Sequence, residues 1–166
     1  MHRLPVFVIL SGLAFLPCVA ACTAAEPERV LIQSVEVRVS PVGPVVLLKV
    51  RNRAIPVFVD AIVAESIQGA LTGVKTPRPL THDLMHTILE AYEGKVTQVV
   101  VTLKERTYYG ALTVVVGKTT KVFDSRSSDA IALAIHFKAP ILVPQELLDT
   151  SGIDLDEPGA KPETRT

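Results

Sequence analysis

The sequence predicts a single α+β domain in which helices pack on a mixed β-sheet. The chain has 166 residues, the length of one domain once an export segment at its start is set aside. Some short stretches alternate apolar and polar residues, as strands do, and others repeat their apolar residues at helical spacing. These stretches come in blocks and not as regular strand–helix–strand units, which favours α+β over a parallel α/β fold.

The N-terminal segment has the pattern of a lipoprotein signal peptide. A positively charged start, Met1-His2-Arg3, precedes an apolar run from Leu4 to Leu16 that is too short for a stable membrane span. Val19-Ala20-Ala21-Cys22 then resembles the lipobox that is cleaved before a lipidated cysteine. We expect residues 1–21 to be removed, Cys22 to carry lipid and residues 22–29 to form a tether. Cleavage after Thr23-Ala24-Ala25 is the alternative, and would give a soluble secreted or periplasmic protein.

The chain has two cysteines, Cys18 and Cys22. Cleavage removes the first and acylation consumes the second, so the mature domain keeps no free thiol. Cysteine nucleophiles, thiolate zinc sites and disulfide bridges are therefore not expected.

The domain is expected to span residues 30–148. Its first half has the pattern of several strands followed by a helix. Alternating valines indicate a strand with one exposed face at Val30 to Val39, and Val45 to Val50 is an apolar run of strand length. A hairpin loop at residues 51–54 leads to a strand at Pro56 to Val59. Helical spacing follows from Asp60 to Leu71, and Gly73 ends that helix.

The second half begins with an amphipathic helix from Thr81 to Tyr92, which Thr81 can cap. The remaining elements are expected in the order strand, strand, strand, helix, strand, at residues 96–104, 108–116, 120–123, 129–137 and 141–143. Ser127 or Ser128 is expected to cap the last helix. Residues 149–166 are acidic and rich in Pro and Gly, and are expected to form a flexible tail.

An internal repeat is a further prediction. A hairpin and then a helix beginning Asp60-Ala61-Ile62 have a counterpart in a second hairpin and a helix beginning Asp129-Ala130-Ile131.

The charge balance limits how the domain can contact nucleic acid. Residues 26–148 hold 14 basic and 12 acidic side chains. Proteins that hold long stretches of nucleic acid usually show a strong basic excess. Any contact with nucleic acid is therefore expected to be local, over a few phosphates.

The first candidate site is the string Pro77-Arg78-Pro79-Leu80-Thr81-His82-Asp83-Leu84. The prolines hold Arg78 near a helix start, where free N–H groups and the positive end of the helix dipole favour a phosphate. His82 can move a proton near neutral pH. The alternative is structural, because Thr81 and Asp83 are also ordinary residues for a helix start.

The second candidate site is Asp124-Ser125-Arg126-Ser127-Ser128-Asp129, again an arginine before a capped helix. Asp124 and Asp129 can bind a divalent cation such as magnesium or manganese, and Arg126 the phosphate it neutralises. The alternative is a capped helix whose Asp124 pairs with Arg126. No Gly-rich phosphate loop is present, and no organic cofactor is expected.

His82 and His86 have the spacing of a zinc-metalloprotease helix, with Asp83 where glutamate is usual. Because no third histidine follows, we expect no zinc site here.

The two candidate segments resemble those of the bifunctional nuclease family, whose members are described as acting on DNA and RNA. The resemblance runs from about Val35 to Val143. It includes both strings above, and also Ile55-Pro56-Val57-Phe58-Val59, Thr107-Tyr108-Tyr109-Gly110-Ala111-Leu112, the continuation to Ala134 and Ala139-Pro140-Ile141. This sequence has Asp60 where the family usually has Gly, Val63 where it has Glu, and Ser127 where it has Pro.

The resemblance implies hydrolysis of phosphodiester bonds in DNA or RNA, and a homo-oligomer joined through sheet edges. His82 is expected as general acid or base with Asp83 positioning it, and Arg78 and Arg126 as phosphate ligands. Thr81, Ser128, Asp124 and Asp129 complete the expected site. The alternative is an envelope module, attached to the membrane through its lipid, that binds an anionic ligand or a partner at the same helix starts without turnover. Val63 favours that alternative, and the intact string from Arg78 to Asp83 favours the nuclease.

Overall fold

The alternating valines of the sequence become the strands of two sheets, seen in a computed structural model that describes residues 27–155. The predicted signal peptide, Cys22 and residues 156–166 lie outside the described residues. Within these, the chain forms nine strands and four helices.

The larger sheet has five strands in the order β1-β8-β5-β6-β7. β5 and β8 run parallel and every other neighbouring pair is antiparallel, so this sheet is mixed. Its strands are β1 (Arg29–Leu31), β8 (Ile141–Pro144), β5 (Gly94–Lys104), β6 (Thr107–Val116) and β7 (Thr119–Arg126).

The smaller sheet has four antiparallel strands in the order β2-β3-β4-β9. The strands are β2 (Ser34–Ser40), β3 (Gly43–Val50), β4 (Arg53–Phe58) and β9 (Ile153–Asp154). Both faces of β3 are covered over Val45–Leu48, which explains why this stretch is an unbroken apolar run.

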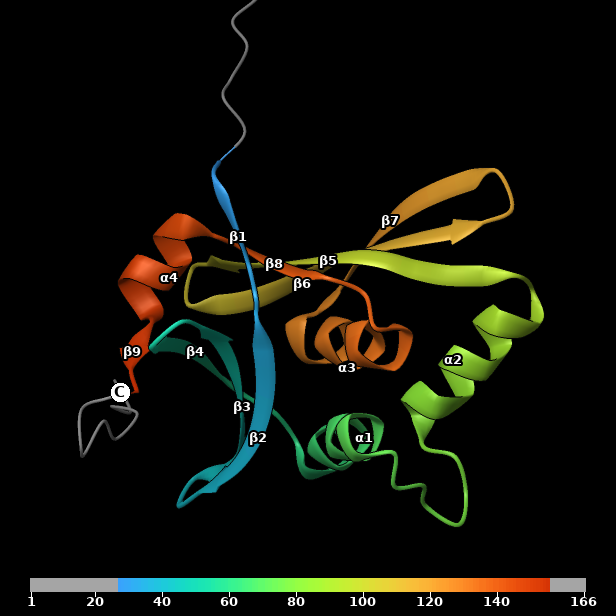
Figure 1. The fold of residues 1–166 in the computed structure, drawn as a ribbon, viewed down its shortest axis with the longest axis horizontal. Coiled ribbons are helices and arrows are strands. Elements are labelled where there is room, and N and C mark those ends of the chain that lie inside the picture. The colour runs from blue at the N-terminus through green and yellow to red at the C-terminus, as the bar shows by residue number, and fades with distance from the viewer. Residues whose placement is uncertain (1–26, 156–166) are drawn as a thin grey trace, which may run out of the picture.

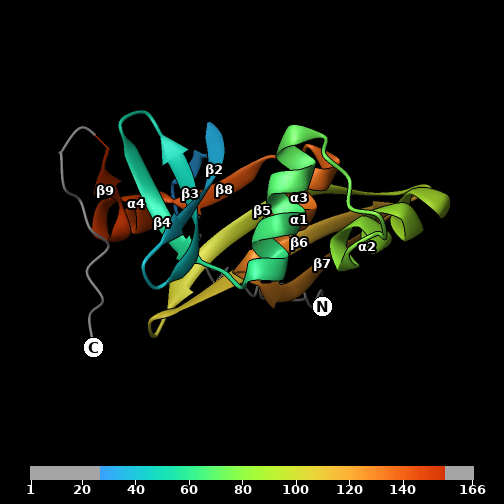
Figure 2. The same cartoon turned by 90° about the horizontal axis from the view of Figure 1, so that it is seen from below.

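The helices join the two sheets into one core. α3 (Ser127–Phe137) lies under the larger sheet, and α1 (Ala61–Thr72) packs on the other side of α3 (Figures 1 and 2). α2 (Thr81–Ala91) lies at the side of α3, and α4 (Gln145–Ser151) lies near the smaller sheet. Seven residues of α3 are buried, more than in any other described helix, so this central position matches its apolar sequence.

The α+β class of the prediction is confirmed, but the strands form two sheets where one was expected. The single strand predicted over residues 30–39 is two strands. The Ile32 N–H donates to Ile141 O of the larger sheet, and the next N–H, of Gln33, donates to Lys49 O of the smaller sheet. The chain changes sheet between these residues while the apolar alternation continues, so the sequence pattern could not reveal the break.

Helix and strand continue beyond the predicted end of the domain at residue 148. α4 and β9 were not predicted, and residues 149–155 belong to these elements and their flanks. The order hairpin then helix occurs twice, as β3-β4-α1 and β6-β7-α3. The two hairpins lie in different sheets, so an internal repeat stays a prediction. No helix among residues 27–155 combines the length and the apolar character that crossing a membrane requires.

Gly110 lets β6 approach α3 closely. A Cβ atom built on Gly110 would lie 2.5 Å from Cβ of Ala130 and 3.1 Å from O of Arg126. We expect Gly110→Ala to lower the free energy of unfolding by about 1–3 kcal/mol, as overpacking of a core does. Chemical denaturation measures this. The double variant Gly110→Ala with Ala130→Gly should lose less stability than the sum of the two single losses, because the second change removes the Cβ that clashes. A loss equal to that sum would contradict the proposed clash.

Candidate functional site at three helix starts

The starts of α1, α2 and α3 border one cavity of about 1140 Å³. Asp60 and Val63 line it from α1, Thr81 and His82 from α2, and Arg126, Asp129 and Leu133 from α3 and the strand before it. The two candidate segments of the sequence thus border the same cavity, and the start of α1 joins them.

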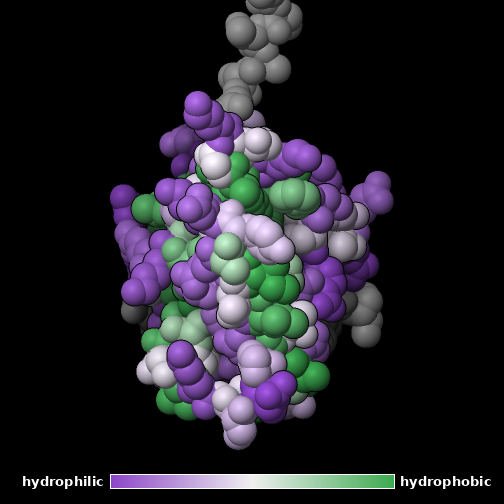
Figure 3. Space-filling view, turned by 90° about the vertical axis from the view of Figure 1, so that its right-hand side faces the viewer, coloured by the Kyte–Doolittle hydropathy of each residue, from purple (hydrophilic) through white to green (hydrophobic). Residues whose placement is uncertain are grey.

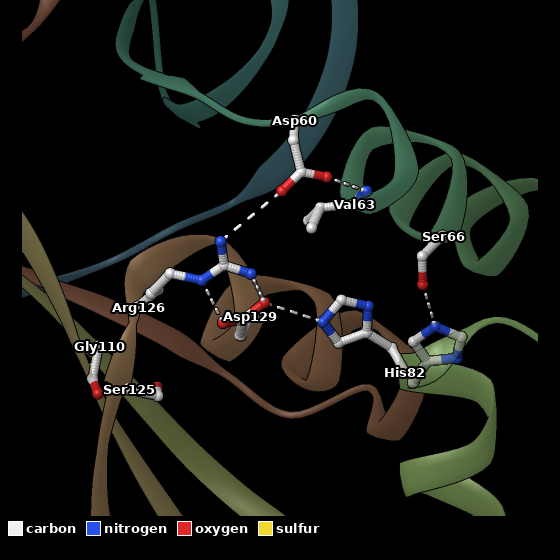
Figure 4. A network of polar contacts seen from close by, with 9 residues as sticks. Asp60, Val63, Ser66, His82, Gly110, Ser125, Arg126 and Asp129 are labelled. Carbon is white, nitrogen blue, oxygen red and sulfur yellow. Dashed lines mark hydrogen bonds and ion pairs between the residues drawn. The ribbon is translucent and has the colours of Figure 1, made fainter.

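Arg126 and Asp129 form the centre of the polar cluster. β7 continues directly into α3, so Arg126 stands at the junction as the residue that precedes the helix. Its Nε donates to Asp129 Oδ2 at 2.7 Å and its Nη2 to Oδ1 at 2.9 Å, a bidentate ion pair within one helical turn (Figure 4). The side chain of Arg126 is 66% exposed, so solvent reaches the guanidinium.

His82 links α2 to the same carboxylate. Its Nε2 lies 3.2 Å from Asp129 Oδ1, and the residue is only 4% exposed (Figure 4). Among the described residues, the buried Nδ1 of His82 has no hydrogen-bond partner. The Asp129 carboxylate thus accepts hydrogen bonds from Arg126, just before α3, and from His82 in α2. These two bonds fix its position.

Asp60 completes the cluster, although no motif in the sequence marks it as a site residue. Its Oδ1 accepts from the Val63 N–H at 2.9 Å, which caps α1, and its Oδ2 lies 3.7 Å from Nη1 of Arg126 (Figure 4). An aspartate just before a helix signals a cap. The second contact depends on α1 and α3 lying side by side, which local sequence does not reveal.

The electrostatics keep Asp129 ionised. Partial burial alone would raise its pKa, but the hydrogen bonds from Arg126 and His82 outweigh burial and hold the pKa below its ordinary value. The same hydrogen bond raises the pKa of Arg126. At neutral pH the site therefore presents a fixed carboxylate beside a guanidinium.

The helix caps differ from those predicted. Thr81 is the first residue of α2 and lines the cavity, while Leu80 is the capping position without a side-chain bond. Ser127 and Ser128 are likewise inside α3 and buried, so neither is a cap, and Ser128 does not line the cavity. Because hydroxyl caps are absent from both starts, their N–H groups are left to other acceptors.

Asp83 does not position His82, contrary to the expectation. Its Oδ2 accepts from the Leu80 N–H at 2.8 Å, and its Oδ1 lies 3.8 Å from Nδ1 of His136. Adjacent helical residues point about 100° apart, which separates the two side chains. Arg78 is exposed on the loop before α2 and does not line the cavity, and within residues 27–155 its side chain makes no hydrogen bond or ion pair with the cluster.

The predicted metal ligands do not form a ready site. Asp124 and Asp129 both line the cavity, but both oxygens of Asp129 already accept hydrogen bonds. In the part of the chain that the structure describes, no group of three or more His, Cys, Asp or Glu side chains is placed to hold a metal ion. These donors do not fit a resident divalent cation, which prefers several oxygen ligands.

A second polar cluster, which the sequence did not suggest, lies between α1, α2 and α3. Ser66 Oγ and His136 Nε2 are 3.0 Å apart, joining α1 to α3, and the ring of His86 packs against those of His136 and Phe137. Ser66 is 2% exposed, so this contact is part of the packing between helices.

His136 makes stability depend on pH. Burial lowers its pKa below the ordinary value of 6.5. The charge of Asp83 opposes this shift, and those of His86 and His82 add to it, each by a smaller amount. As pH falls below about 6.5 the unfolded chain binds a proton at this residue before the folded chain does, so stability present above that pH is lost. We expect urea midpoints to fall between about pH 7 and pH 5, and to fall less in His136→Gln. Equal pH dependence in both proteins would contradict this assignment.

The fold and the cavity together define an α+β domain with an Arg–Asp–His cluster at converging helix starts. The family model of the bifunctional nuclease domain matches residues 45–156, and the chain belongs to that family. It is similar to the uncharacterized protein MT1877 of Mycobacterium tuberculosis (strain CDC 1551 / Oshkosh), with 34% identity over 113 residues, 66% of this chain and 67% of that protein. The uncharacterized protein Rv1829 of Mycobacterium tuberculosis (strain ATCC 25618 / H37Rv) matches with the same identity and coverage.

Proposed function

We propose that the helix-start cavity hydrolyses phosphodiester bonds in DNA or RNA. The observation that carries this proposal is the position of Asp129, an ionised carboxylate held by Arg126 and His82 at the wall of an open cavity. Family membership adds support, because both predicted signature segments contribute to this cluster.

In the proposed reaction, the exposed guanidinium of Arg126 holds a phosphate oxygen beside the α3 start, where unpaired N–H groups favour negative charge. Asp129 orients a water molecule and accepts its proton as the water oxygen bonds to phosphorus. The ester bond to the sugar oxygen breaks, and that oxygen takes a proton from the solvent that fills the open cavity. His82 is buried and faces Asp129, so its role is to hold the carboxylate and share its proton.

The contact with substrate should be short. Lys121 and Arg126 are the basic residues of the cavity lining, against Asp60, Asp124 and Asp129. This balance supports binding of one or two phosphates and not of a long duplex track.

A binding role without turnover is the second candidate, and one contact favours it. Arg126 is already paired with Asp129 and lies near Asp60, so a phosphate must compete with two carboxylates for the guanidinium. An anionic ligand can bind simply by replacing a carboxylate at the guanidinium of Arg126, and no catalytic group is required for that.

A cleavage assay of the purified protein separates the two candidates. Labelled single-stranded and duplex DNA and RNA are incubated with the wild type, without added metal and with magnesium or manganese. We expect cleavage of at least one substrate. Binding of labelled oligonucleotide without cleavage under every condition would favour the second candidate and overturn the first.

We also propose that the domain is exported and held in the cell envelope, facing the periplasm, by lipid on Cys22. The motive is the apolar segment followed by Val19-Ala20-Ala21-Cys22. We expect Cys22→Ala to move most of the protein from the membrane fraction to the soluble fraction or to leave it uncleaved. Unchanged membrane binding of a cleaved Cys22→Ala protein would rule out the lipid anchor.

A further inference from the structure

The cavity continues from the polar cluster into an aliphatic groove between α2 and the β6–β7 hairpin. One wall is α2, and the floor is the paired strands, with Leu112 opposite Phe123 and Val114 opposite Lys121. The apolar residues that line the groove are Ile62, Met85, Ile88, Leu89, Leu112, Val114, Val116 and Phe123.

Several of these apolar side chains are open to solvent. Ile62 is 62% exposed, Ile88 and Phe123 are each 48% exposed, and Val116 is 41% exposed. Figure 3, which views the side of the molecule that carries α2, shows hydrophobic side chains gathered in a band between hydrophilic margins. A continuous exposed apolar surface of this kind usually marks a binding site.

The chemistry of the lining limits what can fill the groove. Between the helix starts and Lys121, it offers hydrocarbon and one aromatic ring. A nucleobase buried there would leave ring N–H and C=O groups without partners, at a cost of several kcal/mol. A saturated hydrocarbon chain needs no hydrogen bonds and gains from burying each methylene group.

The dimensions also suit a chain. The groove floor runs from Ser125 to Thr119 along β7, roughly 20 Å at the usual rise per strand residue. It is open at the side, so a flexible chain can enter without a change in the fold.

The rim at the helix starts carries both signs of charge. Arg126 is cationic, and Asp60, Asp124 and Asp129 are anionic. A head group with a phosphate beside a quaternary or primary amine can pair with both sets. A purely anionic head group would be repelled by the three carboxylates.

We propose that the groove binds the hydrocarbon chain of a single-chain amphiphile whose zwitterionic phosphate head lies at Arg126, Asp60 and Asp129. This inference stands on the lining of the groove and does not depend on phosphodiester hydrolysis. Because head and phosphate substrate would share Arg126, the amphiphile also competes with oligonucleotide for the site.

Calorimetric titration with octyl-, decyl- and dodecylphosphocholine, each kept below its micelle concentration, tests the proposal. Affinity should rise about fourfold for each added methylene, since each buried methylene contributes nearly equally. The fatty acid of equal chain length, with its anionic head, should bind more weakly. Affinity independent of chain length, or stronger binding of the fatty acid, would overturn the proposal.

Two pairs of matched variants locate the binding site. Ile88→Asp and Phe123→Asp place a charge inside the groove and should each weaken binding of decylphosphocholine at least tenfold. Their controls are Leu84→Asp on the same helix and Val122→Asp on the same strand, both exposed and both outside the groove lining. The controls should bind within about twofold of the wild type, because they leave the lining intact. Equal weakening in all four variants would show nonspecific adsorption.

Sedimentation of the same samples tests whether a second copy of the chain occupies the groove instead. If the wild type binds no amphiphile and is a dimer that Phe123→Asp dissociates, a second copy fills the groove and the proposal is wrong. Cleavage activity is scored separately, so an inactive protein that binds amphiphiles with the expected chain-length dependence would overturn only the nuclease proposal.

Discussion

Arg126→Ala is expected to lower the rate constant of phosphodiester cleavage by about 10²–10³, the usual cost of removing one preorganised charge-stabilising donor. The loss arises because Arg126 is the guanidinium that borders the cavity and is fixed by Asp129. Stability should change little, since the side chain is 66% exposed and surface ion pairs contribute weakly. Single-turnover cleavage and thermal unfolding of the same preparation measure both quantities.

Arg78→Ala is the matched comparison. Arg78 is also an exposed arginine before a helix start, but it lies outside the cavity lining. We therefore expect a smaller loss of rate than for Arg126→Ala. A larger loss for Arg78→Ala would mean that substrate binds over the loop before α2 and that the cavity is not the reaction site.

Ile131→Ala is expected to have the largest effect on stability, about 2–5 kcal/mol in the free energy of unfolding. Ile131 is 0% exposed in α3, the helix that packs on the larger sheet and on α1. Truncation removes buried methyl and methylene groups and leaves a cavity that the surrounding elements cannot easily close. Denaturant unfolding monitored by circular dichroism gives the difference.

Ile62→Ala provides the control for that measurement. Ile62 is 62% exposed on α1, and the same chemical change should alter stability by no more than about 0.5 kcal/mol. Similar losses for the two variants would contradict the central position of α3 in the core.

The sequence predicted the elements whose side-chain period is regular. α2, β5, β6 and the turns between the later strands lie within a few residues of the predicted positions, because their apolar spacing reflects one buried face. β9 was missed since two residues are too few to show a period. The change of sheet at Ile32 and Gln33 depends on pairing with distant strands, which local spacing does not encode.

The sequence predicted several residues of the site but not the contacts between them. His82, Arg126 and Asp129 stood out because each lies at a helix start, and the structure brings them together. Asp83 accepts from the Leu80 N–H and not from His82, because neighbouring residues of a helix point in different directions. Asp60 joins the cluster through the packing of α1 on α3, a tertiary contact with no local signal.

The most direct test of the proposed hydrolytic site compares the wild type with Asp129→Asn on one labelled oligonucleotide that the wild type cleaves. The substitution keeps the shape of the side chain but removes the charge that Arg126 and His82 hold in place. We expect a fall of about 10²-fold or more in the single-turnover rate constant. An Asp129→Asn protein that is folded and cleaves at the wild-type rate would contradict it.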